Sequence, residues 1–399
     1  MVSVCLYFQV HQPFRLRRFS VFERQPRYFD EDRNRTLCQQ IAERCYRPAN
    51  AIIEDLIARH DRRFRVAYSL TGIVIEQLQR YAPDVLESFQ RLAATGAVEF
   101  LSETYHHSLS FLYSPEEFAQ QVTLHRELIC RLFGQTPQVF RNTELIYSND
   151  LAKAARDMGY RVVLCEGADH LLGYRSPTYL YTPPNASDVR LLLKNYRLSD
   201  DIAFRFGNRQ WSGWPLTADK FARWIRQVDG NGYVVNLFLD YETFGEHQRA
   251  ETGIFEFLRH LPEQVFQAGS VDFKTPAECA AAYPPSGDYD VPYMISWADV
   301  ERDLSAWLGN AMQSNALHEL YMLEPAIKEY GDPEILDTWR KLQSSDHFYY
   351  MSTKYLADGD VHRYFNPYDS PYDSYINFMN VLDHLRSRLP KRAQAAKAG

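Results

Sequence analysis

The sequence predicts an α/β protein in which a parallel β/α barrel is followed by a helical region. Strand-like and helix-like segments alternate along residues 1–285, which is typical of parallel β/α units. Polar residues come directly after several of the predicted strands. In a barrel the positions after the strands lie together on one face, where the catalytic residues are found. A doubly wound sheet is disfavoured because no strand is followed by a GxGxxG or P-loop motif.

The first predicted strand covers residues 2–10, where apolar residues occupy every second position, and it ends at His11-Gln12-Pro13. A helix is predicted over 84–95. Ser114 is expected to cap another helix, with Pro115 at its first position, and Thr275 with Glu278 predicts a further capping box. A helix is also expected to end at Gly159. Further strands are predicted at 64–70, 98–101, 139–141, 161–165, 189–195 and 233–240.

The character of the chain changes near residue 286. Residues 284–287, Pro-Pro-Ser-Gly, are predicted to form a linker or loop. Helical patterns follow at 304–323, 333–343 and 376–388, and the tail 391–399 is expected to be frayed. We therefore expect a catalytic barrel domain at 1–285 and a helical region at 286–399.

Composition excludes several classes of protein. The 399 residues are enough for one large barrel, and 45% hydrophobic with 24% charged residues indicates an ordinary buried core. A net charge of -7 without a basic stripe argues against a nucleic-acid partner. The sequence shows neither a signal peptide nor a transmembrane segment, so we expect no membrane association. Six scattered cysteines predict a reduced, cytoplasmic protein, and the oligomeric state stays open.

Two acidic segments are candidates for chemistry. Glu144 directly follows an apolar strand, although an ordinary glutamate opening a helix would look the same. Asp240 begins the segment Asp-Tyr-Glu-Thr-Phe-Gly-Glu-His, which places three acids and a histidine after another apolar strand. This segment predicts either a metal site or a carboxylate pair of Asp240 and Glu242. The metal interpretation lacks an HxxxH or HExxH pairing that would supply the remaining ligands.

Taken together, several segments give the chain a family resemblance. Each is weak alone, but their order over some 300 residues resembles glycoside hydrolase family 57, and the segment at Asp240 resembles its α-amylase branch. The segments are His11–Pro13, Gly72–Glu76, Phe140–Tyr147, Asp240–His247 and Ser296–Asp303.

The resemblance implies an incomplete (β/α)7 TIM-like barrel followed by a C-terminal helical region that completes the active site. It implies Glu144 as the nucleophile and Asp240 as the general acid/base. It also implies substrate contacts from His11, Glu76, Glu242, Trp297 and Asp303. Other candidates for substrate contact are His106, His107, His247, Trp211 and Trp214. A lone histidine is usually an ordinary hydrogen-bonded polar residue, and the two tryptophans could equally anchor a loop.

The expected activity is retaining hydrolysis of α-1,4-glucosidic bonds in starch, glycogen and maltooligosaccharides. It would proceed by double displacement without cofactor or metal, with the two carboxyl groups about 5–5.5 Å apart. The nearest alternative is a 4-α-glucanotransferase or branching enzyme using the same site. Alternatives of other classes are a metal-dependent deacetylase or mannosidase and a non-catalytic glucan-binding protein.

Overall fold

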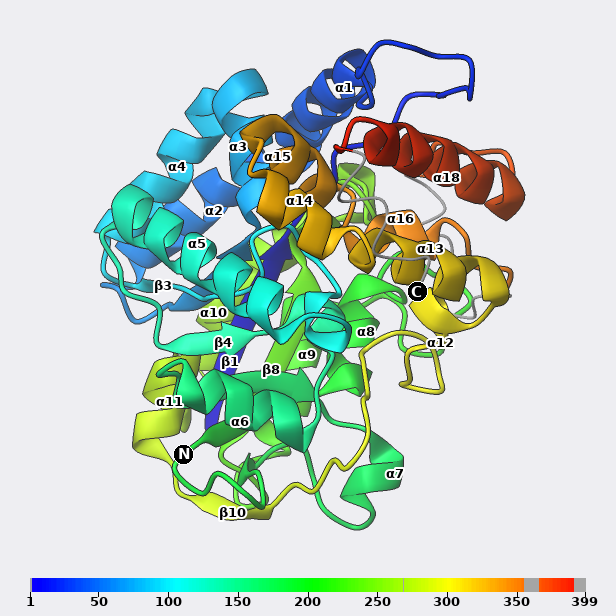
Figure 1. The fold of residues 1–399 in the computed structure, drawn as a ribbon. Coiled ribbons are helices and arrows are strands. Elements are labelled where there is room, and N and C mark those ends of the chain that lie inside the picture. Colours follow the sequence, from blue (N-terminus) through cyan, green and yellow to red (C-terminus); the bar gives the residue numbers. More distant parts are fainter. Residues whose placement is uncertain (1, 268, 355–365, 391–399) are drawn as a thin grey trace.

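The computed structural model describes residues 2–267, 269–354 and 366–390. Its core consists of two β-sheets that lie side by side as parts of one TIM-like barrel (Figure 1). The first sheet contains β1 (Val2–Val10), β2 (Val66–Leu70), β3 (Val98–Phe100), β8 (Val234–Asp240) and β9 (Val271–Phe273). Its order is β3-β2-β1-β8, with β9 also paired with β1, and all pairings are parallel.

The second sheet has the order β10-β6-β7-β5-β4 and is parallel except between β6 and β7. Its strands are β4 (Val139–Arg141), β5 (Val162–Glu166), β6 (Leu180–Thr182), β7 (Arg190–Lys194) and β10 (Pro285–Asp288). A bridge between Ser102 and Phe140 links β3 to β4, and the Asn195 amide donates to the Asn236 carbonyl at 2.9 Å beside β7 and β8. Within the described residues the ladder does not form a closed ring, which agrees with the expected incomplete barrel.

Helices cover the outside of both sheets (Figure 1). Strand β1 shows why they pack there. Val4, Leu6 and Phe8 belong to the apolar cluster shared with the outer helices, whereas the alternating residues Cys5 and Tyr7 belong to the cluster inside the barrel. The covering helices are α1 (Glu31–Ile41), α2 (Arg47–Arg59), α3 (Gly72–Tyr81), α4 (Pro83–Ala94), α5 (Pro115–Phe133), α6 (Asn149–Asp157), α7 (Asp169–Leu172), α8 (Tyr196–Ala203), α9 (Ala218–Arg226), α10 (Ile254–Phe266) and α11 (Pro276–Ala282).

The remaining helices pack against the long loop that follows β1. Leu16, Phe19 and Tyr28 of that loop share an apolar cluster with these helices, and Asn377 donates to the Arg17 carbonyl at 3.0 Å. The helical region therefore covers the carboxyl end of β1, where it appears in yellow to red in Figure 1. Its helices are α12 (Ser305–Leu308), α13 (Ala311–Tyr321), α14 (Glu324–Tyr330), α15 (Pro333–Lys341), α16 (Ser345–Tyr349) and α18 (Pro371–Ser387).

Most predicted elements are confirmed: every predicted strand through residue 240 has a counterpart whose ends agree within two residues. Both predicted caps also form, at Ser114 and in the capping box of Thr275. Two details were wrong. The single helix expected at 304–323 is two helices, because Asn310 caps a new helix in a capping box with Gln313.

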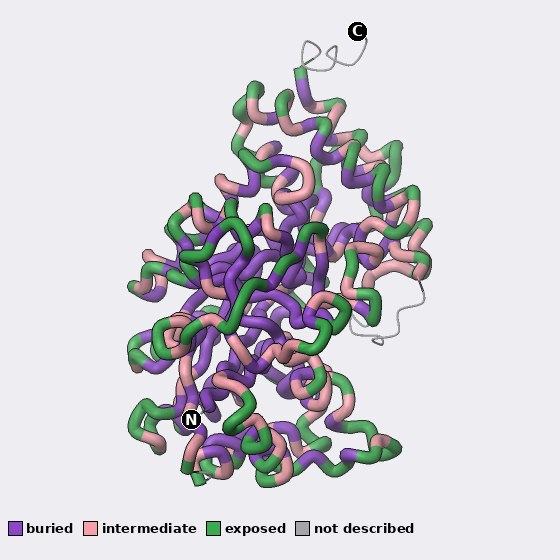
Figure 2. The backbone as a smooth tube through the Cα atoms, turned by 90° about the horizontal axis from the view of Figure 1, so that it is seen from below, coloured by how far each residue is buried: buried purple, intermediate pink, exposed green. Residues whose placement is uncertain are grey.

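The second wrong detail is the predicted linker at 284–287, since Pro285–Asp288 forms the edge strand β10. The predicted frayed tail at 391–399 lies outside the described residues. Buried residues fill the centre of the molecule and exposed residues lie at its rim (Figure 2). Among the described helices we find none with the length and hydrophobicity that a membrane span requires.

Candidate active site

A cavity lies at the carboxyl ends of β1 and β8, beneath the helical region. Including its open mouth, its volume is about 570 Å³. It draws side chains from barrel loops and from the helical region alike. The lining residues are Gln9, His11, Gln12, Pro13, Arg15, His107, Glu144, Asp240, Glu242, His247, Trp297, Asp346 and Tyr350.

Glu144 sits in a strained turn directly after β4. It lies in the 3-10 turn η3 (Thr143–Leu145) with φ 57° and ψ 26°, a left-handed conformation that is costly for a residue with a side chain. Contacts with the rest of the protein help to hold the turn: Leu145 is buried inside the barrel, and the Glu144 carbonyl accepts from the Trp297 amide at 3.2 Å. The strained backbone therefore directs the Glu144 carboxylate into the cavity.

The Glu144 carboxylate accepts hydrogen bonds from three side chains. His107 Nε2 donates to Oε1 at 3.2 Å, and Ser345 Oγ donates to the same oxygen at 2.8 Å. Trp297 Nε1 donates to Oε2 at 2.8 Å. Hydrogen bonds of this kind stabilise the ionised form of a carboxyl group. Ser345 and Trp297 both lie beyond residue 285, so the C-terminal region supplies two of these donors.

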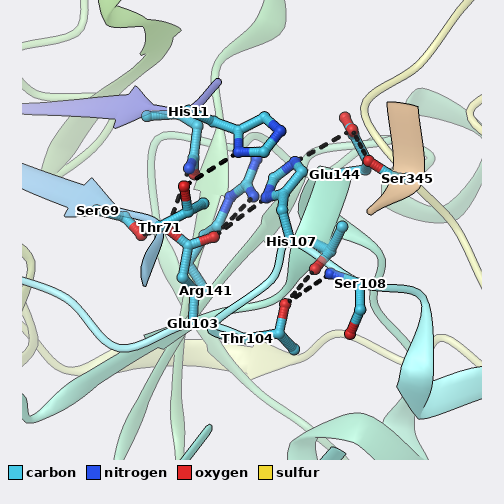
Figure 3. A network of polar contacts seen from close by, with 12 residues as sticks. His11, Ser69, Thr71, Glu103, Thr104, His107, Ser108, Arg141, Glu144 and Ser345 are labelled. Atoms are coloured by element: carbon cyan, nitrogen blue, oxygen red, sulfur yellow. Dashed lines mark hydrogen bonds and ion pairs between the residues drawn. The ribbon is translucent and has the colours of Figure 1, made fainter. Parts of the chain in front are cut away.

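Below Glu144 lies a row of alternating charges (Figure 3). His107 Nδ1 contacts Glu103 Oε2 at 3.2 Å, and Arg141 lies 4.0 Å from the same oxygen. Burial lowers the pKa of His107, but the bonds to Glu103 and Glu144 outweigh it and raise that pKa to about 9. Burial likewise raises the pKa of Glu103, yet His107 and Arg141 bring it down to about 2. The imidazole is thus charged at neutral pH between two carboxylates.

His11 connects this row to the helical region. Its Nδ1 lies 3.1 Å from Thr71 Oγ1 and its Nε2 lies 2.8 Å from Asp346 Oδ2. The ring stacks on His107 with centroids 4.0 Å apart. Burial and the neighbouring His107 charge lower the pKa of His11, so the two stacked rings carry one charge between them at neutral pH.

Asp240 and Glu242 form the other acidic side of the cavity. Asp240 is the last residue of β8, and Glu242 follows in the turn η4 (Tyr241–Thr243). Glu242 accepts a short hydrogen bond from the Tyr46 hydroxyl and one from Gln12 Nε2 at 3.4 Å. Burial, and after it the charge of Asp240, raises the pKa of Glu242 to about 8. At neutral pH this pair of carboxyl groups therefore holds a proton inside the cavity.

The structure brings together only some of the residues singled out in the sequence. Those that line the cavity are His11, His107, Glu144, Asp240, Glu242, His247 and Trp297. The predicted residues that lie elsewhere are Glu76, His106, Trp211, Trp214 and Asp303.

Each of the five has other contacts. Glu76 accepts from the Tyr105 hydroxyl at 3.0 Å and pairs with Lys341 at 3.2 Å. His106 is buried beside Tyr105, and Trp211 packs edge-on against Trp224. Trp214 is 43% exposed on the surface, next to Arg209. Asp303 is exposed and accepts a hydrogen bond from Ser305 instead of reaching the cavity. Their roles in substrate binding stay predictions.

Several residues that line the cavity or bond to the residues lining it were not identified from the sequence. Ser345, Asp346 and Tyr350 lie in or beside the short helix α16, whose local pattern looks like any helix start. Glu103 is one of the polar residues that come directly after a predicted strand, and nothing else in its local sequence marks it. The polar run from Gln343 to His347, buried almost throughout, is the one local signal that could have indicated a site.

Two further observations concern ligands and thiols. Across the ranges that the structure describes, no three His, Cys, Asp or Glu side chains are grouped so that they could hold a metal ion. All six cysteines are free thiols, and Cys130 is the least buried of them.

Comparison with known proteins places this chain among glycoside hydrolases. The model of the family described as glycosyl hydrolase family 57 matches residues 5–292. A protein of Methanocaldococcus jannaschii named "Putative alpha-amylase" is 43% identical over 392 residues, covering 94% of this chain and 82% of that protein.

Two solved structures share the fold at low sequence identity. The 4-alpha-glucanotransferase of Thermococcus litoralis superposes with a TM-score of 0.69 at 16% identity, over 87% of this chain and 56% of that one. A branching enzyme of Thermococcus kodakaraensis superposes with a TM-score of 0.68 at 12% identity, over 96% of this chain and 89% of that one. These likenesses support the TIM-like fold with its helical region.

Proposed function

The chain belongs to glycosyl hydrolase family 57, and from that premise we propose that it hydrolyses α-1,4-glucosidic bonds with retention of anomeric configuration. The proposed substrates are glucans of the starch and glycogen type and maltooligosaccharides. The observation that carries the proposal is one cavity containing both a carboxylate that accepts three hydrogen bonds, Glu144, and a carboxyl pair that holds a proton, Asp240 with Glu242. Two carboxyl groups in different protonation states are what glycosidic cleavage requires.

In the proposed mechanism Glu144 attacks the anomeric carbon while Asp240 donates a proton to the departing glycosidic oxygen. Water then attacks the glycosyl-enzyme, Asp240 takes the proton of that water, and Glu144 leaves as a carboxylate. Burial of Glu144 and its three donors supports its role as the ionised partner. The end of β8, where Asp240 is only partly buried, supports the role of a residue that exchanges protons with substrate and water.

Transfer to a second glucan is the nearest alternative. It is favoured by the two solved structures that share the fold, which are a 4-alpha-glucanotransferase and a branching enzyme. The relative with 43% identity carries the name of an amylase, which favours hydrolysis. We further propose a cytoplasmic location, supported by the six free thiols.

Product analysis separates the two activities. The purified protein is incubated with maltoheptaose, amylose, glycogen and pullulan, and the products are sized over time. Hydrolysis yields shorter oligosaccharides alone, whereas longer or branched products would establish transfer. Binding to these glucans without any product would instead support the non-catalytic alternative.

Azide rescue tests the assignment of the pair. Asp240→Asn should abolish cleavage of natural glucans but still form a glycosyl-enzyme from an α-glycosyl fluoride, which needs no proton for departure. Azide, which needs no general base, should then release an α-glycosyl azide. Glu144→Ala should lose several orders of magnitude in turnover, and azide in the vacated space should give the β product by a single inversion. The same anomer from both variants would refute the assignment.

A further inference from the structure

We propose that His107 is a positioning residue that stays a cation beneath Glu144 throughout the catalytic cycle, and that this charge stabilises Glu144 when it leaves the glycosyl-enzyme. The inference rests on the proposed role of Glu144 as the nucleophile. It assigns to His107 a role that acts through another residue, in place of the direct substrate contact expected from the sequence.

The geometry of the His107 ring leaves little freedom for another role. Both ring nitrogens are engaged, with Nδ1 3.2 Å from Glu103 Oε2 and Nε2 3.2 Å from Glu144 Oε1. The ring face is covered by His11 at a centroid distance of 4.0 Å (Figure 3). His107 also adopts φ 53°, so the backbone is strained in order to hold the ring between the two carboxylates.

Glu103 is built to keep that charge in place. It is fully buried, accepts from Ser69 Oγ through a short bond and from Gln9 Nε2 at 3.0 Å, and lies 4.0 Å from Arg141. A buried carboxylate with these partners stays ionised. If His107 were neutral, Glu103 would keep its buried negative charge with Arg141 as the nearby cation, which is unfavourable. The row Glu144, His107, Glu103, Arg141 therefore balances two negative and two positive charges.

The groups that face His107 come from several elements, and most favour its protonated form. Glu103 and Glu144 raise its pKa, whereas burial lowers it, with a result of about 9. His11, stacked on the ring, takes no proton at neutral pH because its own pKa is lowered. The other charged or titratable groups around this row are Arg141 on β4, Asp346 on α16 behind His11, and Asp240 and Glu242 across the cavity.

The distribution of donors over Glu144 indicates which oxygen reacts. Oε1 accepts from both His107 and Ser345, whereas Oε2 accepts from Trp297. Because His107 and Ser345 both hold Oε1, we take Oε2 to form the bond to the anomeric carbon, and Oε1 then becomes the ester carbonyl, still held by His107 and Ser345. In the second step the bond from carbon to Oε2 breaks and its electron pair returns to the carboxylate. Water forms the new bond and its proton passes to Asp240, while the His107 cation stabilises the released charge.

The wild-type protein provides a test of the charge that needs no catalysis. Nitrogen-15 NMR of the histidine rings should show a ring that is protonated on both nitrogens at pH 7 and loses a proton only near pH 9. The Glu144→Gln variant should lower the pH of that transition, which identifies the signal. A set of spectra with every buried histidine neutral at pH 7 would overturn the proposal, whatever reaction the protein catalyses.

The His107→Asn variant tests the consequence for turnover. Asparagine tolerates the left-handed backbone at this position and carries no charge. A neighbouring cation lowers the pKa of a carboxyl group by about one to three units. Loss of the His107 charge should therefore shift the acid limb of the pH profile of kcat/KM, which reports protonation of Glu144, to higher pH by about that amount. With an α-maltosyl fluoride the glycosyl-enzyme should accumulate as a burst, because the second step slows. His384→Gln, on α18 and bonded to Tyr28 at 2.7 Å, serves as the matched control and should change neither readout.

If His107→Asn does not fold, Glu103→Gln replaces it. In that variant His107 should lose its proton at lower pH, and the burst should appear above the pH at which the ring becomes neutral. An unshifted acid limb with no burst, in a folded variant of an enzyme that hydrolyses glucans, would overturn the role of His107. A wild-type protein without any turnover of α-glucans would refute the proposed function instead, and the NMR result would still decide the charge.

Discussion

Replacing Glu242 by glutamine should make the stability of the folded protein less sensitive to pH. Burial and the charge of Asp240 raise the pKa of Glu242 from 4.5 to about 8, so the folded state favours the protonated acid. The stabilisation from this group is complete below pH 4.5, where folded and unfolded chains are both protonated, and is lost as the pH rises through 8. At about 1.4 kcal/mol per pH unit, the loss for wild type over this interval reaches up to about 5 kcal/mol.

Glutamine keeps the shape of the side chain, and its amide oxygen can accept the same bonds from Tyr46 and Gln12. Urea unfolding of wild type and Glu242→Gln, followed by circular dichroism from pH 4.5 to 8.5, measures the difference. The gap in unfolding free energy should grow in favour of the variant as the pH rises. Glu256→Gln, at an exposed position on α10, controls for loss of a surface charge. Parallel stability curves for wild type and Glu242→Gln would refute the assignment of a buried, protonated Glu242.

Three further results are expected. Trp297→Phe removes the hydrogen bond from the indole to ionised Glu144, and a bond of this kind contributes about 1.5–3 kcal/mol. The variant should lower kcat/KM by about tenfold to a hundredfold. An unchanged value would show that Glu144 does not depend on the indole. A chain ending at residue 285 should be inactive and poorly soluble, because it lacks Ser345 and Trp297 and exposes the apolar surface of the loop after β1; a soluble, fully active truncation would contradict this. EDTA should leave activity intact, whereas a loss restored specifically by zinc would favour the metal-dependent alternative.

Local sequence was enough for the elements that repeat one pattern over many residues. Strand β1 is predicted from its alternation, and the caps at Ser114 and Thr275 are predicted because the capping side chain and its amide partner are neighbours in the chain. The short edge strand β10 could not be predicted in this way. Its four residues contain proline and glycine, and only pairing with β6 makes them a strand.

By itself the sequence determined the α/β class, the order of strands and the position of acids directly after two apolar strands, because each depends on residues close together in the chain. Only the tertiary structure decided which side chains meet. Glu144 acquires its donors from His107, Ser345 and Trp297, which lie 37 to 201 residues away. The protonation of His107 and Glu242 depends in the same way on burial and on charges from other elements. A carboxyl group after a strand has the same local sequence whether it is exposed or surrounded by donors, so its chemistry becomes defined only when the barrel and the helical region pack together.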